Sequence, residues 1–268
     1  MNGFRGCLFK DRKEFFRKRI NLICLAMILL CFFLVLGGTA IMPKLLAILS
    51  ETNKNIIADD TSLTEFLNKF FPQNLSASLG IFASDIGVFY NLVMIFLTYS
   101  MLPEEITSGK MILPICAGHR KEHFLLSKEI IYGSLMSIPA FGGYMLYYLI
   151  GSSILNGDCD SRHIFINAVI MMASVFFVVN YTIVLSALTR AKYSALFFMV
   201  GVVLIGPDAL SFLSIGRFFP TYILTYLYKF EMNIGRVIIP LCLNAIILVL
   251  LNVYALNGGM RVNVDTRR

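Results

Sequence analysis

Two short clusters of polar side chains in the middle of the chain carry the residue types that could do chemistry. His119, Glu122 and His123 are spaced so that two imidazoles could share a metal ion while the carboxylate acts as a base. Glu104 and Glu105 form a second cluster, a pair of adjacent carboxylates. Either cluster could serve hydrolysis, so a membrane-embedded, metal-dependent hydrolase or protease is one hypothesis for this chain.

The rest of the chain determines what could position those residues. Apolar residues make up 57% of the 268 and charged residues only 15%, with a mean hydropathy of +0.76. A soluble domain carries about a quarter charged residues, whereas here apolar residues gather in blocks close to the ~20 residues that cross a bilayer. The composition predicts an all-α integral membrane protein. Six blocks are predicted to be transmembrane helices: Asn21–Met42, Ile81–Leu102, Ile130–Leu155, Ile164–Leu188, Tyr193–Ile205 and Val237–Leu256.

The basic residues predict the orientation of these spans. With the N-terminus inside, sixteen of the 23 lysines and arginines fall in cytoplasmic segments, which places both termini in the cytoplasm. We therefore expect a multi-pass protein of the cytoplasmic (plasma) membrane, in which the net charge of +7 reflects topology and not nucleic-acid binding. Around the six-helix domain at 21–256 we expect an amphipathic cytoplasmic helix at 1–20, outer loops at 43–80 and 206–236, an inner loop at 103–129, and a cytoplasmic tail at 257–268.

This topology weakens the hydrolase hypothesis. After the two histidines, the cytoplasmic segments offer only Glu129 and Asp265 as further carboxylate ligands. The glutamate pair resembles that of CAAX-processing membrane proteases, and His163 begins a segment that resembles another of their motifs. However, Glu104 is predicted inside and His163 outside, so one active site cannot use both. Acidic residues at the start of a helix are also favoured by the helix dipole alone, which explains Glu104 and Glu105 without catalysis.

The predicted spans contain no lysine, arginine or glutamate, and the chain has no phosphate-binding loop. Ion-driven carriers place ionisable groups at mid-membrane. Here the interior polarity comes mainly from asparagines, and we expect Asn91, Asn180 and Asn244 to line a pathway or to hydrogen-bond between helices. A P-loop would need Ser or Thr after its Gly-Lys, but Met111 follows Gly109-Lys110. If the chain takes part in active transport, the ATPase must be a separate subunit.

The inner loop carries the most specific signal. It runs from an acidic start through a short apolar stretch and a glycine to a basic cluster, and then enters the third span. This order resembles the second-to-third-span loop of ABC-2-type transporter permeases, and the six-span layout resembles that family over the whole chain. Lys110 replaces the usual threonine, and Pro114 is unexpected, so we expect two short helices broken around residues 114–118. The matching residues are Glu105, Ser108-Gly109, Ile115, Gly118-His119, Arg120 and Leu126-Ser127-Lys128.

The resemblance implies an ABC-2, type V exporter-like architecture in which this chain is a transport subunit and not an enzyme. It implies that the loop is a coupling helix on an ABC ATPase subunit, which would bind ATP and Mg²⁺, and that a second, identical or homologous permease subunit completes the pathway. The leading hypothesis is export (efflux) of a peptide, drug or other amphipathic compound. The residues expected to couple to the ATPase are Glu105, Gly109, Ile112, Leu113, Ile115, Gly118, His119, Arg120 and Lys121. Those expected in a connecting helix beside that contact are Phe15, Phe16, Arg17 and Arg19.

Overall fold

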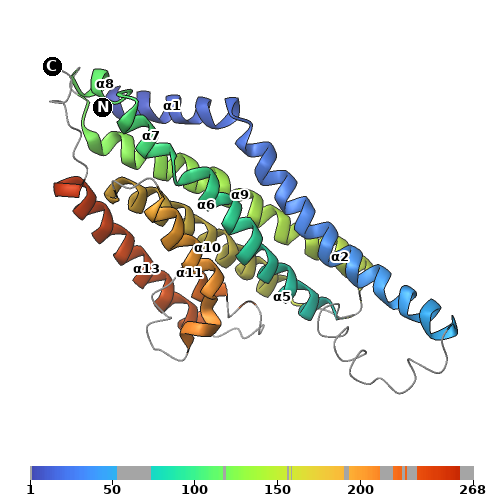
Figure 1. Ribbon diagram of the computed structural model, residues 1–268. Coiled ribbons are helices and arrows are strands. Elements are labelled where there is room, and N and C mark those ends of the chain that lie inside the picture. Colours follow the sequence, from blue (N-terminus) through green and yellow to red (C-terminus); the bar gives the residue numbers. More distant parts are fainter. Residues whose placement is uncertain are drawn as a thin grey trace.

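The computed structural model describes residues 2–52, 74–116, 119–155, 157, 159–189, 193–211, 220–224, 227 and 234–259. In these ranges every regular element is a helix, which confirms the all-α class (Figure 1). The α-helices are α1 Asn2–Arg17, α2 Ile20–Thr52, α5 Leu75–Asp85, α6 Asn91–Thr98, α7 Met101–Thr107, α8 Ile112–Cys116, α9 Lys121–Ile154, α10 Ser161–Leu188, α11 Ser194–Ser211 and α13 Ile234–Tyr254. The others are the π-helices η1 Ile86–Tyr90 and η4 Ala255–Gly259 and the 3₁₀-helix η3 Pro220–Leu224.

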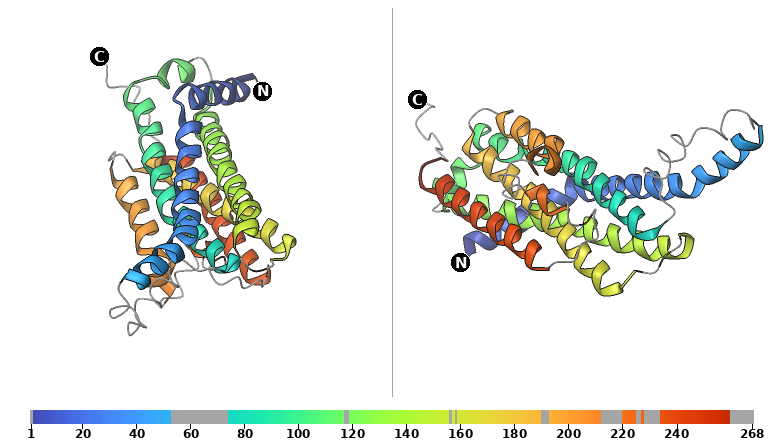
Figure 2. Two further views of the ribbon diagram at one scale, coloured as in Figure 1. Left: turned by 90° about the vertical axis from the view of Figure 1, so that its right-hand side faces the viewer. Right: turned by 90° about the horizontal axis from the view of Figure 1, so that it is seen from below.

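The long helices run side by side as an elongated bundle, and α1 lies across one end of it (Figures 1 and 2). The chain turns from α1 into α2 at Arg19, whose φ of 56° is a left-handed conformation that is uncommon outside glycine. α9 packs against α10, α1, α2 and α5, and α10 also contacts α11 and α13. The pair α9–α10 is therefore the centre of the bundle, and α2 and α13 flank it.

The outer helices expose the large apolar side chains that a lipid environment requires. Phe33 of α2, Phe197 of α11 and Ile239 of α13 are each about two-thirds exposed or more, at 68%, 73% and 67%. Apolar surface of this extent is characteristic of a membrane-facing protein. Four helical stretches of the described chain are long and apolar enough to cross a membrane: Ile20–Ile41, Leu75–Thr107, Ser161–Leu188 and Val237–Asn257.

The two other expected spans lie in α9 and α11. At 34 residues α9 is long enough to cross, but its buried face is rich in glycine, serine and tyrosine, which lowers its hydropathy. In α11 the apolar stretch Ser194–Leu204 is short. Membrane character is thus established by four helices, and a total of six spans stays a prediction.

Several helix boundaries differ from those expected. α2 continues ten residues past Met42, and α5 begins at Leu75, so both ends of the expected outer loop at 43–80 are helical. α11 continues through Gly206 to Ser211. Backbone hydrogen bonding does not stop where an apolar run stops, so hydropathy marks the span and not the helix end. The remainder of that outer loop, most of the loop at 206–236, and the tail from 260 lie outside the described residues.

Candidate coupling site

The expected inner loop consists of three helical pieces, α7, α8 and the beginning of α9. Gly109, with a φ of 70°, makes the turn between α7 and α8, and its carbonyl accepts a hydrogen bond from the Ile112 amide at 3.0 Å. The expected break around residues 114–118 begins later than Pro114, because α8 continues to Cys116 and α9 begins at Lys121. Pro114 is the third residue of α8, where a helix has no acceptor for an N–H and proline is tolerated.

The residues expected to contact an ATPase divide into buried and accessible groups. Glu105 is buried, at 5% exposure, and Met111 beside α8 is fully buried and anchors the short helix to the core. Arg120 is exposed, and so are Lys110 and the thiol of Cys116. Gly109, Ile112, Ile115, His119 and Lys121 are partly exposed. The side chain of Leu113 and the whole of Gly118 lie outside the described residues.

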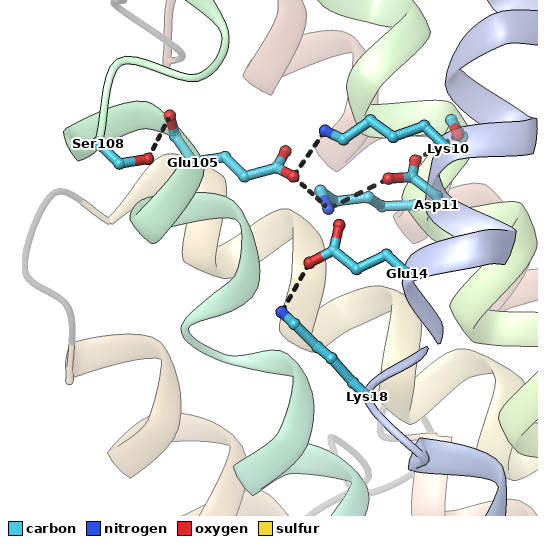
Figure 3. A network of polar contacts seen from close by, with 8 residues as sticks. Lys10, Asp11, Glu14, Lys18, Glu105 and Ser108 are labelled. Atoms are coloured by element: carbon cyan, nitrogen blue, oxygen red, sulfur yellow. Dashed lines mark hydrogen bonds and ion pairs between the residues drawn. The ribbon is translucent and has the colours of Figure 1, made fainter. Parts of the chain in front are cut away.

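A network of buried charges ties this segment to α1 (Figure 3). The ammonium of Lys128 in α9 lies 3.2 Å from Oε1 of Glu105 in α7 and 3.5 Å from Oδ1 of Asp11 in α1. Lys10 adds a second ion pair to the same Glu105 oxygen at 2.8 Å, and the Ser127 hydroxyl donates to Asp11 Oδ2. Helices far apart in sequence thus share one set of charges: two lysines facing two carboxylates.

Burial sets the electrostatics of this network. Lys128 is 1% exposed and Asp11 is 2% exposed. Burial raises the pKa of the Asp11 carboxyl above its ordinary value, and the Lys128 ammonium and the Ser127 hydroxyl offset part of that rise. Glu105 Oε2 is buried without a hydrogen-bond partner. Each charge therefore depends on its neighbours, and removing one would leave another uncompensated.

A carboxylate oxygen from each of Asp11, Glu14 and Glu105 falls within 4.8 Å of the others, a spacing compatible with a metal ion. Lysines already accompany these acids: Lys128 pairs with Asp11 and with Glu105, and Lys18 pairs with Glu14 at 2.7 Å. Ion pairing is sufficient to explain the acidic cluster.

The two histidines of the possible hydrolase lie against the start of α1. His119 precedes α9 and His123 is in its first turn, so the two do not share a helical face. A Cβ atom on Gly3 would come within 2.6 Å of His119 Nδ1, and the Phe4 ring lies 5.8 Å from that of His123. A pocket of about 440 Å³ borders this contact, lined by Phe4, Arg5, Glu122, His123 and Leu126. Among the described residues, the three-ligand grouping compatible with a metal ion is the acidic cluster above and not these histidines.

The glutamate pair and His163 lie at opposite ends of the bundle. Glu105 is beside Lys128 near the start of α9, whereas His163 follows the end of that helix. The 26 residues of α9 between them correspond to about 40 Å. Glu104 is exposed and Glu105 is committed to the buried ion pairs.

The aromatic residues of the expected connecting helix face opposite ways. Phe15 is buried, at 1% exposure, and its ring lies 5.5 Å from that of Tyr132 in α9. Phe16 is 47% exposed, and Arg17 and Arg19 are exposed as well. α1 thus packs one side onto α9 and presents a basic side that also carries an aromatic ring.

The three asparagines expected in the interior are all buried. Asn244 of α13 accepts a hydrogen bond at 3.2 Å from the Tyr181 hydroxyl of α10, so it joins two helices. Asn91 donates within its own helix, to the Gly87 carbonyl at 3.0 Å. Asn180 of α10 lies against Gly133 of α9, where a Cβ would come within 2.7 Å of its Oδ1. Asn244 therefore hydrogen-bonds between helices, whereas Asn180 lies between two helices with its Oδ1 buried and without a hydrogen-bond partner.

Sequence reasoning missed Asp11 and the role of Lys128. One signal was available: Cys7, Asp11 and Phe15 are spaced by four residues, which puts an acid on the buried side of α1.

Comparison with known proteins identifies no family model and no curated protein that matches this chain.

Proposed function

We propose that this chain is the transmembrane subunit of an ABC-2-type, ATP-driven exporter and that residues 103–129 couple it to a separate ABC ATPase. In this proposal the bundle crosses the cytoplasmic membrane six times, pairs with a second permease subunit, and moves a peptide, drug or other amphipathic compound outward. ATP and Mg²⁺ belong to the partner ATPase. The observation that carries the proposal is the buried charge network joining α7, α9 and α1 at one end of the bundle.

This network would transmit a displacement of α8, caused by the bound ATPase, to the membrane helices. The turn at Gly109 joins α8 directly to α7, and α7 is fixed to α9 through the Glu105–Lys128 ion pair. Breaking one buried ion pair costs about 3–5 kcal/mol, so the three helices move together. α9 then continues for 34 residues, about 51 Å, alongside the centre of the bundle.

Two exposed arginines give a matched test of the coupling surface. Arg120 precedes α9 beside α8, and Arg162 stands in the first turn of α10 at the other end of the bundle. Where the adjacent gene encodes a P-loop ATPase, the two chains are co-expressed, and complex formation and ATP hydrolysis are measured in lipid nanodiscs. Arg120→Glu should weaken the complex about tenfold and lower ATP hydrolysis, because a rim charge contributes to association. Arg162→Glu should leave both unchanged.

If Arg120→Glu and Arg162→Glu have equal effects on complex formation and ATP hydrolysis, this surface does not couple the chain to the ATPase. Failure of the unmodified chain to co-purify with the ATPase or to alter its rate of hydrolysis would contradict the proposed function itself.

A further inference from the structure

Glu129 and Asn252 form a buried contact between α9 and α13 that the coupling network does not include. Glu129 is 6% exposed, and its Oε2 accepts a hydrogen bond of 3.0 Å from the Asn252 amide nitrogen. The two remaining oxygens, Glu129 Oε1 and Asn252 Oδ1, are both buried and both without a hydrogen-bond partner. Two unsatisfied acceptors on the same pair of side chains require an explanation, because a buried polar atom without a partner destabilises the fold.

One proton would satisfy both atoms. A carboxylate only accepts hydrogen bonds, whereas a carboxylic acid also donates one, and an amide does both. With Oε1 protonated, Glu129 can donate to Asn252 Oδ1 while Oε2 continues to accept from the amide nitrogen. Turning the amide over does not remove the need, since it would place Oδ1 against Oε2, again with two acceptors facing each other.

No described cation is available to neutralise Glu129 instead. The neighbouring Lys128 is directed to Asp11 and Glu105, and Lys10 on α1 pairs with the same Glu105. α10 packs against both α9 and α13, but its Arg162 and His163 are at its opposite end. α13 has no charged residue among its side chains that the structure describes, Val237–Tyr254.

The remaining groups near this end do not change that conclusion. Tyr132, one turn after Glu129, has a buried hydroxyl with no partner, and Asp11, Glu14 and Glu105 belong to the network of α1. Glu129 precedes the expected span at Ile130, and burial raises its pKa from the ordinary 4.5 to about 7, with the Asn252 hydrogen bond acting in the opposite direction.

We propose that Glu129 is a proton-binding site, and that the protonated carboxyl closes a two-way acid–amide pair with Asn252 that holds α9 to α13. Loss of the proton leaves a buried charge with a single hydrogen-bond donor and loosens this contact. The site does not depend on the coupling role of residues 103–129 and can be tested on the chain alone.

The pH dependence of stability has a definite sign. Because the folded chain holds this proton more firmly than the unfolded chain, the stability due to Glu129 is complete below the ordinary pKa and is lost as the pH rises through about 7. The melting temperature of the purified chain in nanodiscs should fall by about 5 °C between about pH 5.5 and about pH 8.5.

The Glu129→Gln variant mimics the protonated form, because its amide can donate to Asn252 Oδ1 at any pH. It should keep its melting temperature across this range, and the control Glu122→Gln, an exposed acid two turns earlier on α9, should follow the unmodified chain. A wild-type melting temperature that does not fall, or an equal fall in Glu129→Gln, would overturn the proposal. The same would follow if added Na⁺ or K⁺, and not protons, raised the melting temperature at high pH.

Infrared spectroscopy provides a second measurement, because it detects the protonated carboxyl of Glu129 itself and not the stability of the fold. The unmodified chain should show a protonated carboxyl band at about neutral pH that disappears on alkaline titration. This band should be missing from Glu129→Gln and retained in Glu122→Gln. Its presence in Glu129→Gln, or its absence from the unmodified chain, would show that Glu129 does not hold the proton.

Discussion

The ammonium of Lys128 lies 3.2 Å from Glu105 Oε1, and the side chains of both residues are at least nine-tenths buried. The same ammonium also faces Asp11, so one cation of α9 holds acids from α7 and α1. An exposed ion pair contributes about 0–1 kcal/mol, whereas a buried one that loses a partner costs about 3–5 kcal/mol. The position of α1 against the bundle should therefore depend on this single side chain.

Replacing Lys128 by methionine tests that dependence. The substitution keeps the length of the side chain but leaves Asp11 and Glu105 buried, and Lys10 is then the cation that the described residues still pair with Glu105. We expect a loss of about 3–5 kcal/mol in the free energy of unfolding, measured by denaturant titration in mixed micelles. Adding Asp11→Asn and Glu105→Gln should recover much of that loss, since the uncompensated charges are then gone.

Lys18→Met is the matched control, because Lys18, just after α1, pairs with the half-buried Glu14 while its own side chain is 45% exposed. It should cost about 0.5 kcal/mol or less. Similar losses for Lys18→Met and Lys128→Met would mean that the buried network does not fix α1.

The apolar runs of the sequence predicted the long helices but not their ends. The span predicted at Asn21–Met42 is part of a longer helix, α2, which continues to Thr52, because a helix does not have to end where an apolar run ends. In the inner loop, Pro114 predicts a break in the helix, but the third position of a helix accepts proline. The turn itself falls at Gly109, the residue that adopts positive φ most easily.

The candidate site was less predictable than the helices. The charged contacts that join α1 to α7 and α9 are between 95 and 117 positions apart in the sequence, and local patterns do not reveal which helices meet. The spacing of Asp11 with Cys7 and Phe15 indicates a buried acid on α1, but nothing local selects Lys128 as its partner. The contact of Glu129 with Asn252 depends in the same way on α10, which packs against both α9 and α13.

Adjacent glycines in α9 give a prediction about helix packing. A Cβ added at Gly143 would overlap the Ile28 side chain of α2, whereas one added at Gly142 meets nothing within 4 Å. Gly143→Ala should therefore lower the free energy of unfolding by about 1–3 kcal/mol, because α2 must move away from α9. The measurement is again denaturant titration of the purified chain.

Gly142→Ala serves as the control and should stabilise the chain by up to about 1 kcal/mol, since alanine favours a helix interior more than glycine does. Equal effects of the two substitutions would show that α2 and α9 do not meet closely at Gly143.

Two cysteines at opposite ends of the bundle test the proposed orientation. Cys116 is exposed at the end of α8, and Cys159 is partly exposed between α9 and α10. About 51 Å of α9 separates their surroundings, which exceeds the ~30 Å hydrocarbon thickness. A charged thiol reagent cannot cross that layer, because burying its charge in hydrocarbon is costly.

With Cys116 on the cytoplasmic side, labelling of intact cells should be lost in Cys159→Ser and retained in Cys116→Ser. After permeabilisation, Cys116→Ser should lose a site as well. The reverse pattern in intact cells would invert the orientation. The same result in both variants, whether labelling is retained in both or absent from both, would place the two cysteines on one side and contradict an odd number of crossings between them.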